Sequence, residues 1–316
     1  MPKFKIHHVT KYIYNAPVRD SANQIILFPI KDDYQEVLNQ DLHISGDPYL
    51  EIVRDYYGNE VGSFMNADPH LELIIDSKLE VTTRSRPAPP EEKDREIQWN
   101  KLHSIRQQAP YIDFLRQEQF HAWKEVGQIG ELEQARSATP LEAVRKLTAY
   151  VFNHFKYIKG ITSVETTVDE IWQLKAGVCQ DFAHILLVML RMIQIPARYV
   201  SGYICPKKSE MRGEGATHAW VEAYIPFYGW LGVDPTNNCL ADDLHVRLAV
   251  GRSFSDCSPV KGTYKGIAEH RLEVGVSVIY EDGSRSSEPA TVLSPQPVKN
   301  GPQNSYRRFM EMQQQQ

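Results

Sequence analysis

Three residues of the types that perform nucleophilic catalysis on amides follow one another in the second half of the chain: Cys179, His218 and Asp234. In such a site a cysteine attacks as the thiolate, an imidazole moves the proton, and a carboxylate orients the imidazole. If the fold brings these side chains together, they support acyl transfer through a thioester. Each residue also has an ordinary structural interpretation, and its local sequence has to decide between that interpretation and the functional one.

Cys179 stands where a helix is predicted to begin. Gly177 lets the chain turn sharply, and Pro196 ends the helical pattern. The apolar residues between them follow the spacing of one helix face: Phe182, Ile185, Leu186, Met189, Leu190 and Ile193. A helix N-terminus stabilises a thiolate through its dipole and its free N–H groups, and the N–H of Cys179 is available to an oxyanion. A cysteine is more often a buried structural thiol, but this position favours a nucleophile.

His218 opens the predicted strand His-Ala-Trp-Val-Glu-Ala-Tyr-Ile. Alternation places His218, Trp220, Glu222 and Tyr224 on one face and apolar residues on the other. The apolar face is typical of a core, whereas the polar and aromatic face is typical of a cleft wall. A lone histidine is more often structural than catalytic, so the functional interpretation depends on its companions.

Asp234 ends the next predicted strand, directly before Pro235. An aspartate before proline is commonly a turn residue, and its functional interpretation is the carboxylate that orients the imidazole. A symmetric hairpin about residues 226–229 would place Asp234 opposite Val221. To bring Asp234 beside His218, the hairpin needs an asymmetric turn or a bulge, for which Gly232 is the candidate.

The elements that must position these residues fall into blocks. Strand and turn signals fill the first part of the chain, a proline-rich charged stretch follows, and capping boxes begin helices at Thr139 and Thr167. Strands then return, with a late hairpin over 272–283, and a polar segment ends in four glutamines. We therefore predict an α+β protein with a β-rich region over 1–85, a linker over 86–96, a second domain over 97–293 and a disordered tail over 294–316.

The composition limits the classes of binding partner that we expect. The chain has 316 residues and a net charge of −5, which gives no reason to expect nucleic acid or an anionic membrane surface. It contains no apolar run long enough to cross a bilayer, and its first residues alternate rather than forming a signal peptide. Its four cysteines lack CxxC spacing, which is typical of free thiols in a reducing compartment, so the expected location is the cytoplasm.

Four motifs in the order Cys, His, Asp resemble those of the transglutaminase-like superfamily, whose fold is related to papain. They span residues 177–184, 196–203, 217–222 and 229–237. The N-terminal segments 8–14 and 55–59 are similar to the β-rich region that precedes this domain in bacterial members. The resemblance implies a core of helices packed on an antiparallel sheet after a β-rich N-terminal domain. It also implies thiol-dependent amide acyl transfer by Cys179, His218 and Asp234. The sequence has no EF-hand-like calcium loop, so we expect no cofactor.

The resemblance further implies a second oxyanion donor besides the backbone of Cys179. Gln173, six positions before Cys179, is similar in place to the glutamine of papain-like enzymes, although a solvated helix residue is an equally good interpretation. Gln180 and Trp220 are the other candidates. The chain departs from the family pattern at Ser253 and Phe254, a change that could alter the cleft.

Several functions remain open at the level of the sequence. Hydrolysis of a peptide or protein amide is the favoured outcome, and transfer to an amine, which cross-links proteins, is the alternative. The two differ in whether the cleft excludes water from the thioester. A scaffold that keeps the fold without turnover is the alternative from another class. The cysteines and histidines lack the paired spacing of structural zinc sites, so we expect no metal.

Overall fold

The computed structural model describes residues 1–90, 94–118, 120–164, 166–205, 211–212, 217–281, 284 and 291–293. These residues form two compact units. The N-terminal unit contains residues 1–83 and the described residues from 258 onward, and the core unit contains the described residues of 84–257.

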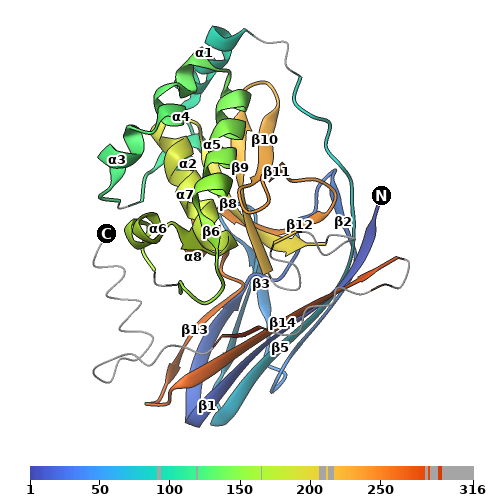
Figure 1. Ribbon diagram of the computed structural model, residues 1–316. Helices are drawn as coiled ribbons and strands as arrows, with labels where there is room; N and C mark the ends of the chain where they lie inside the picture. The colour runs from blue at the N-terminus through green and yellow to red at the C-terminus, as the bar shows by residue number, and fades with distance from the viewer. Residues whose placement is uncertain are drawn as a thin grey trace. The chain divides into compact units, whose positions relative to one another are not determined.

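An eight-stranded antiparallel sheet makes up the N-terminal unit (Figure 1). Its strands are β1 (Lys3–Ile25), β2 (Gln35–Ile44), β3 (Glu51–Arg54), β4 (Glu60–Asn66), β5 (His70–Thr83), β13 (Val260–Lys265), β14 (His270–Tyr280) and β15 (Thr291–Leu293). The long strand β1 organises the sheet, because its first half pairs with β5 and β14 and its second half with β4 and β13. Side chains at alternate positions of β1, such as Phe4 and Ile6, are buried, as the period of a half-buried strand requires.

The late strands lie in a different unit from the one that the sequence analysis assigned to them. The sequence pattern assigns residues up to 293 to the second domain, but β13 and β14 pair with β1. The pairing sets Val278 opposite Ile6 and Tyr280 opposite Phe4, so the buried face of β14 continues that of β1. Local patterns identify a strand but not its partner, which explains the difference. The tail over 294–316, together with residues 282 and 283 of the predicted turn, lies outside the described residues.

The predicted linker contributes to the core unit. Helix α1 (Arg95–Ile105) begins within it, and the Asp94 side chain accepts hydrogen bonds from the first turn. Before the helix, the Arg86 guanidinium donates to the Trp230 carbonyl at 2.6 Å, and the Tyr228 hydroxyl donates to the Pro87 carbonyl at 2.9 Å. The first part of this segment is therefore tied to the hairpin that carries Asp234.

The helices of the core unit begin where the capping signals predict. Thr139 and Glu142 form a capping box at α5, and Thr167 and Glu170 form one at α6. The remaining helices are α2 (Tyr111–Leu115), α3 (Trp123–Gly127), α4 (Gly130–Glu133), a 3-10 turn (Ala135–Ser137), α5 (Pro140–His154), α6 (Val168–Leu174), α7 (Cys179–Met192) and α8 (Phe254–Cys257). The central helix α7 is buried along most of its length.

A five-stranded antiparallel sheet in the order β11-β10-β9-β8-β12 supports these helices. Its strands are β8 (Ala197–Ile204), β9 (Thr217–Ile225), β10 (Gly229–Asp234), β11 (Cys239–Leu240) and β12 (His245–Gly251). Helix α7 packs against β8 and β9, and α5 packs against α7 (Figure 1). The core lies between them, where Leu147, Phe182, Leu186 and Val221 are fully buried. This is the α+β architecture of helices on an antiparallel sheet that the resemblance implies.

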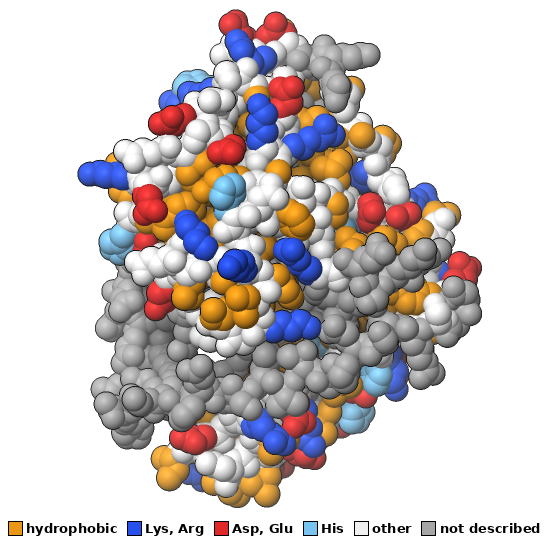
Figure 2. Space-filling view, viewed as in Figure 1, with side chains coloured by type: hydrophobic (Ala, Val, Ile, Leu, Met, Phe, Trp, Pro, Cys, Tyr) orange, Lys and Arg blue, Asp and Glu red, His pale blue; other side chains and the backbone are white. Residues whose placement is uncertain are grey.

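The surface agrees with the small net charge. On the face shown in Figure 2, acidic and basic side chains are interspersed with apolar ones. None of the helices in the described part of the chain combines the length and the apolar character needed to cross a bilayer.

Candidate functional site

Cys179 is the first residue of α7, and Asp181 fixes the start of that helix. The Asp181 carboxylate accepts the N–H of Val178 at 2.7 Å and the hydroxyl of Thr162 at 2.6 Å. A side chain at Gly177 would overlap with this carboxylate, so only glycine allows the cap to form. The backbone N–H of Cys179 lies in the first turn, where the helix itself uses no N–H group. The thiol is half-buried, so it stands at a helix N-terminus within reach of solvent.

His218 and Asp234 are in contact, as the functional interpretation of these two residues requires, and the pair is buried. Nε2 of His218 lies 2.8 Å from Oδ2 of Asp234, and the two residues are 2% and 0% exposed. Nδ1 of His218 has no hydrogen-bond partner among the described residues. Burial alone would lower the pKa of His218, but the charge and hydrogen bond of Asp234, with a contribution from Cys179, raise it to about 10. The imidazole is therefore held by Asp234 on one nitrogen and influenced by the Cys179 thiol.

The hairpin register explains how Asp234 reaches His218. Gly229 pairs with Ile225 and Val233 with Val221, a shift of one residue from the symmetric hairpin. The shift is made in the turn, where Phe227 has a φ of 68° and Gly229 a φ of 102°. Continued by one residue, this register puts Asp234 opposite Trp220. Asp234 therefore lies on the strand face that carries Trp220 and His218, within reach of His218 as its diagonal neighbour. The asymmetric turn is thus confirmed.

The other alternative, a bulge at Gly232, is absent from this hairpin. Gly232 pairs with Glu222 in regular register. A side chain at Gly232 would instead overlap with Ala241, so this glycine permits the close approach of the segment after β11.

The Asp234 carboxylate is held from several sides. Oδ1 accepts the backbone N–H groups of Thr236 at 2.8 Å and Asn237 at 3.3 Å, and Oδ2 accepts the side-chain amide of Asn237 at 2.7 Å. Burial alone would raise the pKa of Asp234, but the charge and hydrogen bond of His218 outweigh it and hold the pKa well below its usual range. Asp234 is therefore ionised although it has no contact with solvent.

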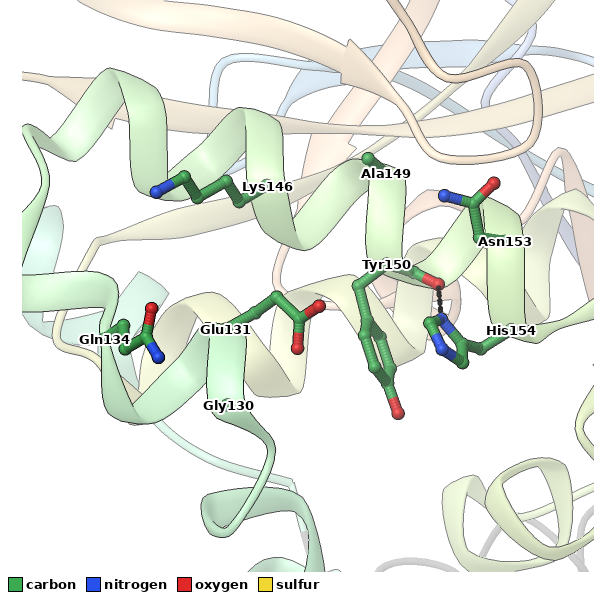
Figure 3. A pocket seen from close by; sticks show the side chains of 8 residues that line it. All are labelled: Gly130, Glu131, Gln134, Lys146, Ala149, Tyr150, Asn153 and His154. Carbon is green, nitrogen blue, oxygen red and sulfur yellow. Dashed lines mark hydrogen bonds between the residues drawn. The ribbon is translucent and has the colours of Figure 1, made fainter.

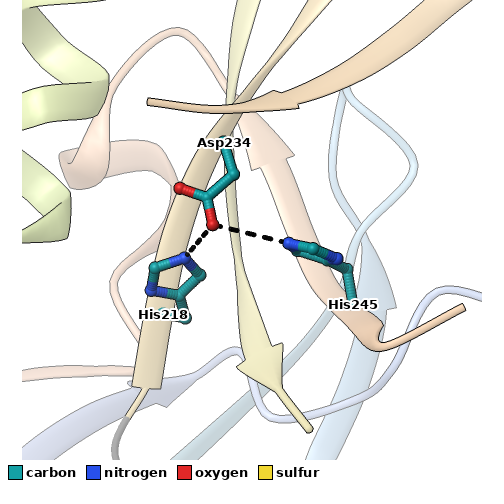
Figure 4. A group of neighbouring side chains, drawn as sticks. All are labelled: His218, Asp234 and His245. Carbon is teal, nitrogen blue, oxygen red and sulfur yellow. Dashed lines mark hydrogen bonds and ion pairs between the residues drawn. The ribbon is translucent and has the colours of Figure 1, made fainter. Parts of the chain in front are cut away.

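A second histidine, which the sequence analysis did not identify, completes this cluster. Nε2 of His245 lies 3.5 Å from Oδ2 of Asp234, opposite His218 (Figure 4). His245 is the first residue of β12, which pairs with β8 and is separated from β10 along the sheet. The one available signal is a histidine at the head of a largely apolar strand, and no spacing rule connects it to Asp234.

The donor atoms of His218, Asp234 and His245 lie within 4.8 Å of one another. Two imidazoles and a carboxylate are a set that zinc accepts. In this structure, however, Oδ2 of Asp234 and Nε2 of His218, which an ion would need, share a 2.8 Å hydrogen bond. A hydrogen-bonded cluster therefore accounts for the arrangement.

The three candidates for a second oxyanion donor lie in different environments. Gln173 is exposed on α6, and Gln180 is half-buried in the first turn of α7, next to Cys179. Trp220 is fully buried and stacks on His218, with ring centroids 6.0 Å apart and an interplanar angle of 29°. Its position suits support of the imidazole rather than contact with a substrate.

The strand face predicted as a cleft wall is largely covered. Glu222 is 3% exposed and pairs with Arg198, whose Nε lies 2.7 Å away, and with Arg247 at 3.6 Å. The charges of both arginines and the hydrogen bond from Arg198 hold the pKa of Glu222 below its usual range against the effect of burial. A polar face can therefore be interior when its charges are paired, a possibility that the alternation pattern does not distinguish.

The segment that departs from the family pattern lies against α7. The N–H of Phe254 donates to Nε2 of His184 at 3.2 Å. Arg252 pairs with Asp256 at 3.1 Å. Of the two substituted residues, Phe254 therefore contacts the helix that carries Cys179.

A surface hollow lies apart from these residues. It has a volume of about 470 Å³ between α4 and α5, and Glu131, Lys146, Tyr150 and His154 project into it (Figure 3). None of the three predicted catalytic residues lines it, and the sequence analysis did not predict it.

Comparison with known proteins gives consistent results. Residues 131–235 match the transglutaminase-like superfamily, and residues 4–82 match the bacterial transglutaminase-like N-terminal region. The Mycobacterium leprae protein ML0607 is 33% identical over 284 residues, which cover 88% of this chain and 99% of that protein. A crystal structure of a candidate cysteine protease from Cytophaga hutchinsonii aligns over 96% of each chain with a TM-score of 0.67 and 21% identity.

A shorter match concerns a named enzyme. The protein-glutamine gamma-glutamyltransferase of Pseudomonas aeruginosa is 34% identical over 118 residues, which cover 34% of this chain and 17% of that enzyme. Together with the full-length match to ML0607 and the fold of the core unit, these matches settle the family. The chain belongs to the transglutaminase-like superfamily and combines its core with a bacterial transglutaminase-like N-terminal region.

Proposed function

We propose that this protein is a thiol-dependent acyltransferase that acts on peptide or protein amides, with hydrolysis as its main outcome. The observation that carries the proposal is the buried 2.8 Å contact between His218 and Asp234, which leaves Nδ1 of His218 without another partner and under the influence of Cys179. A nucleophile, a base and an orienting carboxylate in this order are the requirements of acyl transfer through a thioester.

In the first half of the reaction, Nδ1 of His218 holds the proton as an imidazolium and the Cys179 thiolate attacks the amide carbonyl. The backbone N–H of Cys179 stabilises the oxyanion, and we propose Gln180 as the second donor because it is half-buried in the same turn. The tetrahedral intermediate collapses when the imidazolium of His218 returns the proton to the departing amine. A thioester on Cys179 remains.

In the second half, water attacks the thioester while His218 accepts its proton, and the carboxylic acid and the free thiol are released. An amine that replaces water forms a new amide instead, and this is the alternative outcome. The similarity to a protein-glutamine gamma-glutamyltransferase favours this second candidate. Both outcomes use the same residues and differ only in the acceptor.

The first prediction concerns the reactivity of Cys179, measured as intact-mass labelling with iodoacetamide from pH 5 to pH 9. We expect rapid labelling near pH 6, where an ordinary thiol with a pKa of about 8.5 reacts slowly. The Cys179→Ala variant reports the labelling of Cys239, which is also half-buried. The His218→Ala variant is expected to slow Cys179 by at least about tenfold, because the thiolate loses its imidazolium partner.

Labelling of Cys179 at the rate of an ordinary thiol would contradict the proposal and favour the non-catalytic scaffold. With an activated thiol, casein and a glutamine-containing peptide would be incubated with and without a lysine analogue. Release of new amino termini or of ammonia without the amine shows hydrolysis, and incorporation of the amine shows cross-linking.

A further inference from the structure

His245 is fully buried, yet the proposed reaction makes no use of it. It is 4% exposed overall and its side chain 1%, and its ring packs edge-on against Trp220 with centroids 5.1 Å apart. Nε2 of His245 makes no hydrogen bond with the described residues and faces Oδ2 of Asp234 at 3.5 Å. A buried polar atom without a full partner is costly, so its orientation toward Asp234 calls for an explanation.

Asp242 fixes which nitrogen of His245 carries a proton. Nδ1 of His245 lies 3.2 Å from the backbone N of Asp242 and 3.1 Å from its Oδ1. If His245 is neutral, Nδ1 accepts the backbone N–H and Nε2 is protonated. If His245 is cationic, Nδ1 donates to the carboxylate and Nε2 is again protonated. In both states an N–H group points at Asp234, whereas a neutral ring protonated on Nδ1 would set the lone pair of Nε2 against the Asp234 carboxylate.

We propose that His245 is a positioning residue, whose Nε2–H holds the Asp234 carboxylate in the orientation that His218 requires. The inference rests on the proposed function, because it assigns His245 to the same site. Oδ2 of Asp234 lies between His218, Asn237 and His245, and Oδ1 accepts two backbone N–H groups. With donors on all sides, the carboxylate cannot rotate, and His218 keeps Nδ1 directed toward the thiol.

The charges around His245 agree with this role. Burial alone would lower its pKa, but its interactions with the Asp234 and Asp242 carboxylates raise it. The Asp234 carboxylate therefore interacts with two imidazoles rather than one. Loss of either imidazole leaves the buried negative charge with fewer stabilising partners. Among the described residues, the titratable groups that interact with His245 and Asp234 are His218 on β9, Cys239 on β11, Asp242 before β12 and, through His218, Cys179 on α7.

The second prediction compares two variants of similar length, His245→Gln and His245→Met, in the full chain. Glutamine keeps an N–H donor near the position of Nε2, whereas methionine does not. We expect the rate of Cys179 labelling at pH 6 to fall by about tenfold or more in His245→Met and to stay within about threefold of the wild type in His245→Gln. The pH profile of labelling should move toward that of an ordinary thiol in His245→Met alone.

Two results would overturn the inference: equal labelling of both variants and the wild type, or equal loss in both variants with folding preserved. A double-mutant cycle with Asp234→Asn separates positioning from packing, with labelling measured at pH 8. His245→Met must add less than a twofold effect in the Asp234→Asn background, and a full additional effect contradicts the proposal.

A measurement on the wild type does not depend on the folding of a variant. In ¹⁵N-histidine spectra, Nε2 of His245 is expected to be protonated between pH 6 and pH 8, and an unprotonated Nε2 overturns the inference. The His245→Gln spectrum identifies the resonance. If wild-type Cys179 is not activated at all, the proposed function fails; if it is activated and His245→Met leaves it so, only this inference fails.

Discussion

At the scale of single residues, the site depends on one buried ion pair. The His218 and Asp234 side chains are completely buried, so the protein cannot rely on water to stabilise either charge. Asp234 obtains its stabilisation from donors on three neighbouring segments: His218, Asn237 with Thr236, and His245. The pair therefore has a proposed role in catalysis and also contributes to stability, and both depend on the pH.

The third prediction concerns this link. The pKa of His218 is raised to about 10, so its contribution to stability is complete below the unfolded value of about 6.5 and is lost as pH rises toward 10. The lowered pKa of Asp234 gives a contribution that is present above about pH 3.9 and lost at lower pH. We expect Asp234→Asn to cost about 3–5 kcal/mol between pH 4 and pH 6.5, and the cost to shrink toward pH 10, as measured by urea unfolding.

The control for this prediction is a partly exposed pair of the same two residue types. Nε2 of His7 lies 2.9 Å from Oδ1 of Asp76, with side chains 43% and 30% exposed. Asp76→Asn should cost no more than about 1 kcal/mol, because solvent screens the pair. Equal costs for the two substitutions, or a constant cost for Asp234→Asn across this pH range, would show that burial does not set the energetics of the site.

The site residues also show how far single-residue signals extend. Cys179, His218 and Asp234 could be found because each lies at the predicted end of a helix or strand, and the ends of elements are visible in the sequence. His245 could not be found in this way, because its partner lies on a strand that is not its neighbour in the sheet. Trp220 was predicted on the correct face, but its complete burial depends on what covers that face.

At the scale of elements, the position of Cys179 depends on how α7 begins. The same carboxylate that caps the helix occupies the space beside Gly177, so the glycine and the cap form one device. The sequence predicts both the glycine turn and the helix start. It does not predict that Thr162, from the segment before α6, supplies the other hydrogen bond to Asp181, because that contact depends on tertiary structure.

The fourth prediction tests this device with Gly177→Ala. The new Cβ would overlap with the Asp181 carboxylate, so the cap must move and the thiol with it. We expect a loss of about 1–3 kcal/mol in the free energy of unfolding and a clear fall in the rate of Cys179 labelling at pH 6. Gly130→Ala is the matched control, since a Cβ there meets nothing within 4 Å. Normal labelling in Gly177→Ala would show that the helix start does not position the thiol.

At the scale of the whole molecule, the chain returns to its first unit after completing the core. The motifs predicted the fold of the core unit and the β-rich character of the first 83 residues, because both depend on local patterns and on the resemblance of consecutive segments. The membership of β13 and β14 in the N-terminal unit does not follow from such patterns. Strand β14 pairs with β1 from Phe4↔Tyr280 to Tyr14↔His270, a contact between residues far apart in sequence, and a strand does not encode its partner locally.

The last prediction distinguishes the two assignments of β14. Val278 is 1% exposed and lies opposite Ile6, so Val278→Ala removes buried apolar volume from the N-terminal unit and should cost roughly 1–2 kcal/mol. Hydrogen exchange should then become faster in β1 and β5, while β8, β9 and β10 keep their wild-type protection. Ser277→Ala, on the other face of the same strand, controls for the substitution itself. A cavity first weakens the sheet that contains it. Faster exchange in β8–β10 with β1 unchanged would therefore show that β14 belongs to the core unit, as the local sequence pattern suggests.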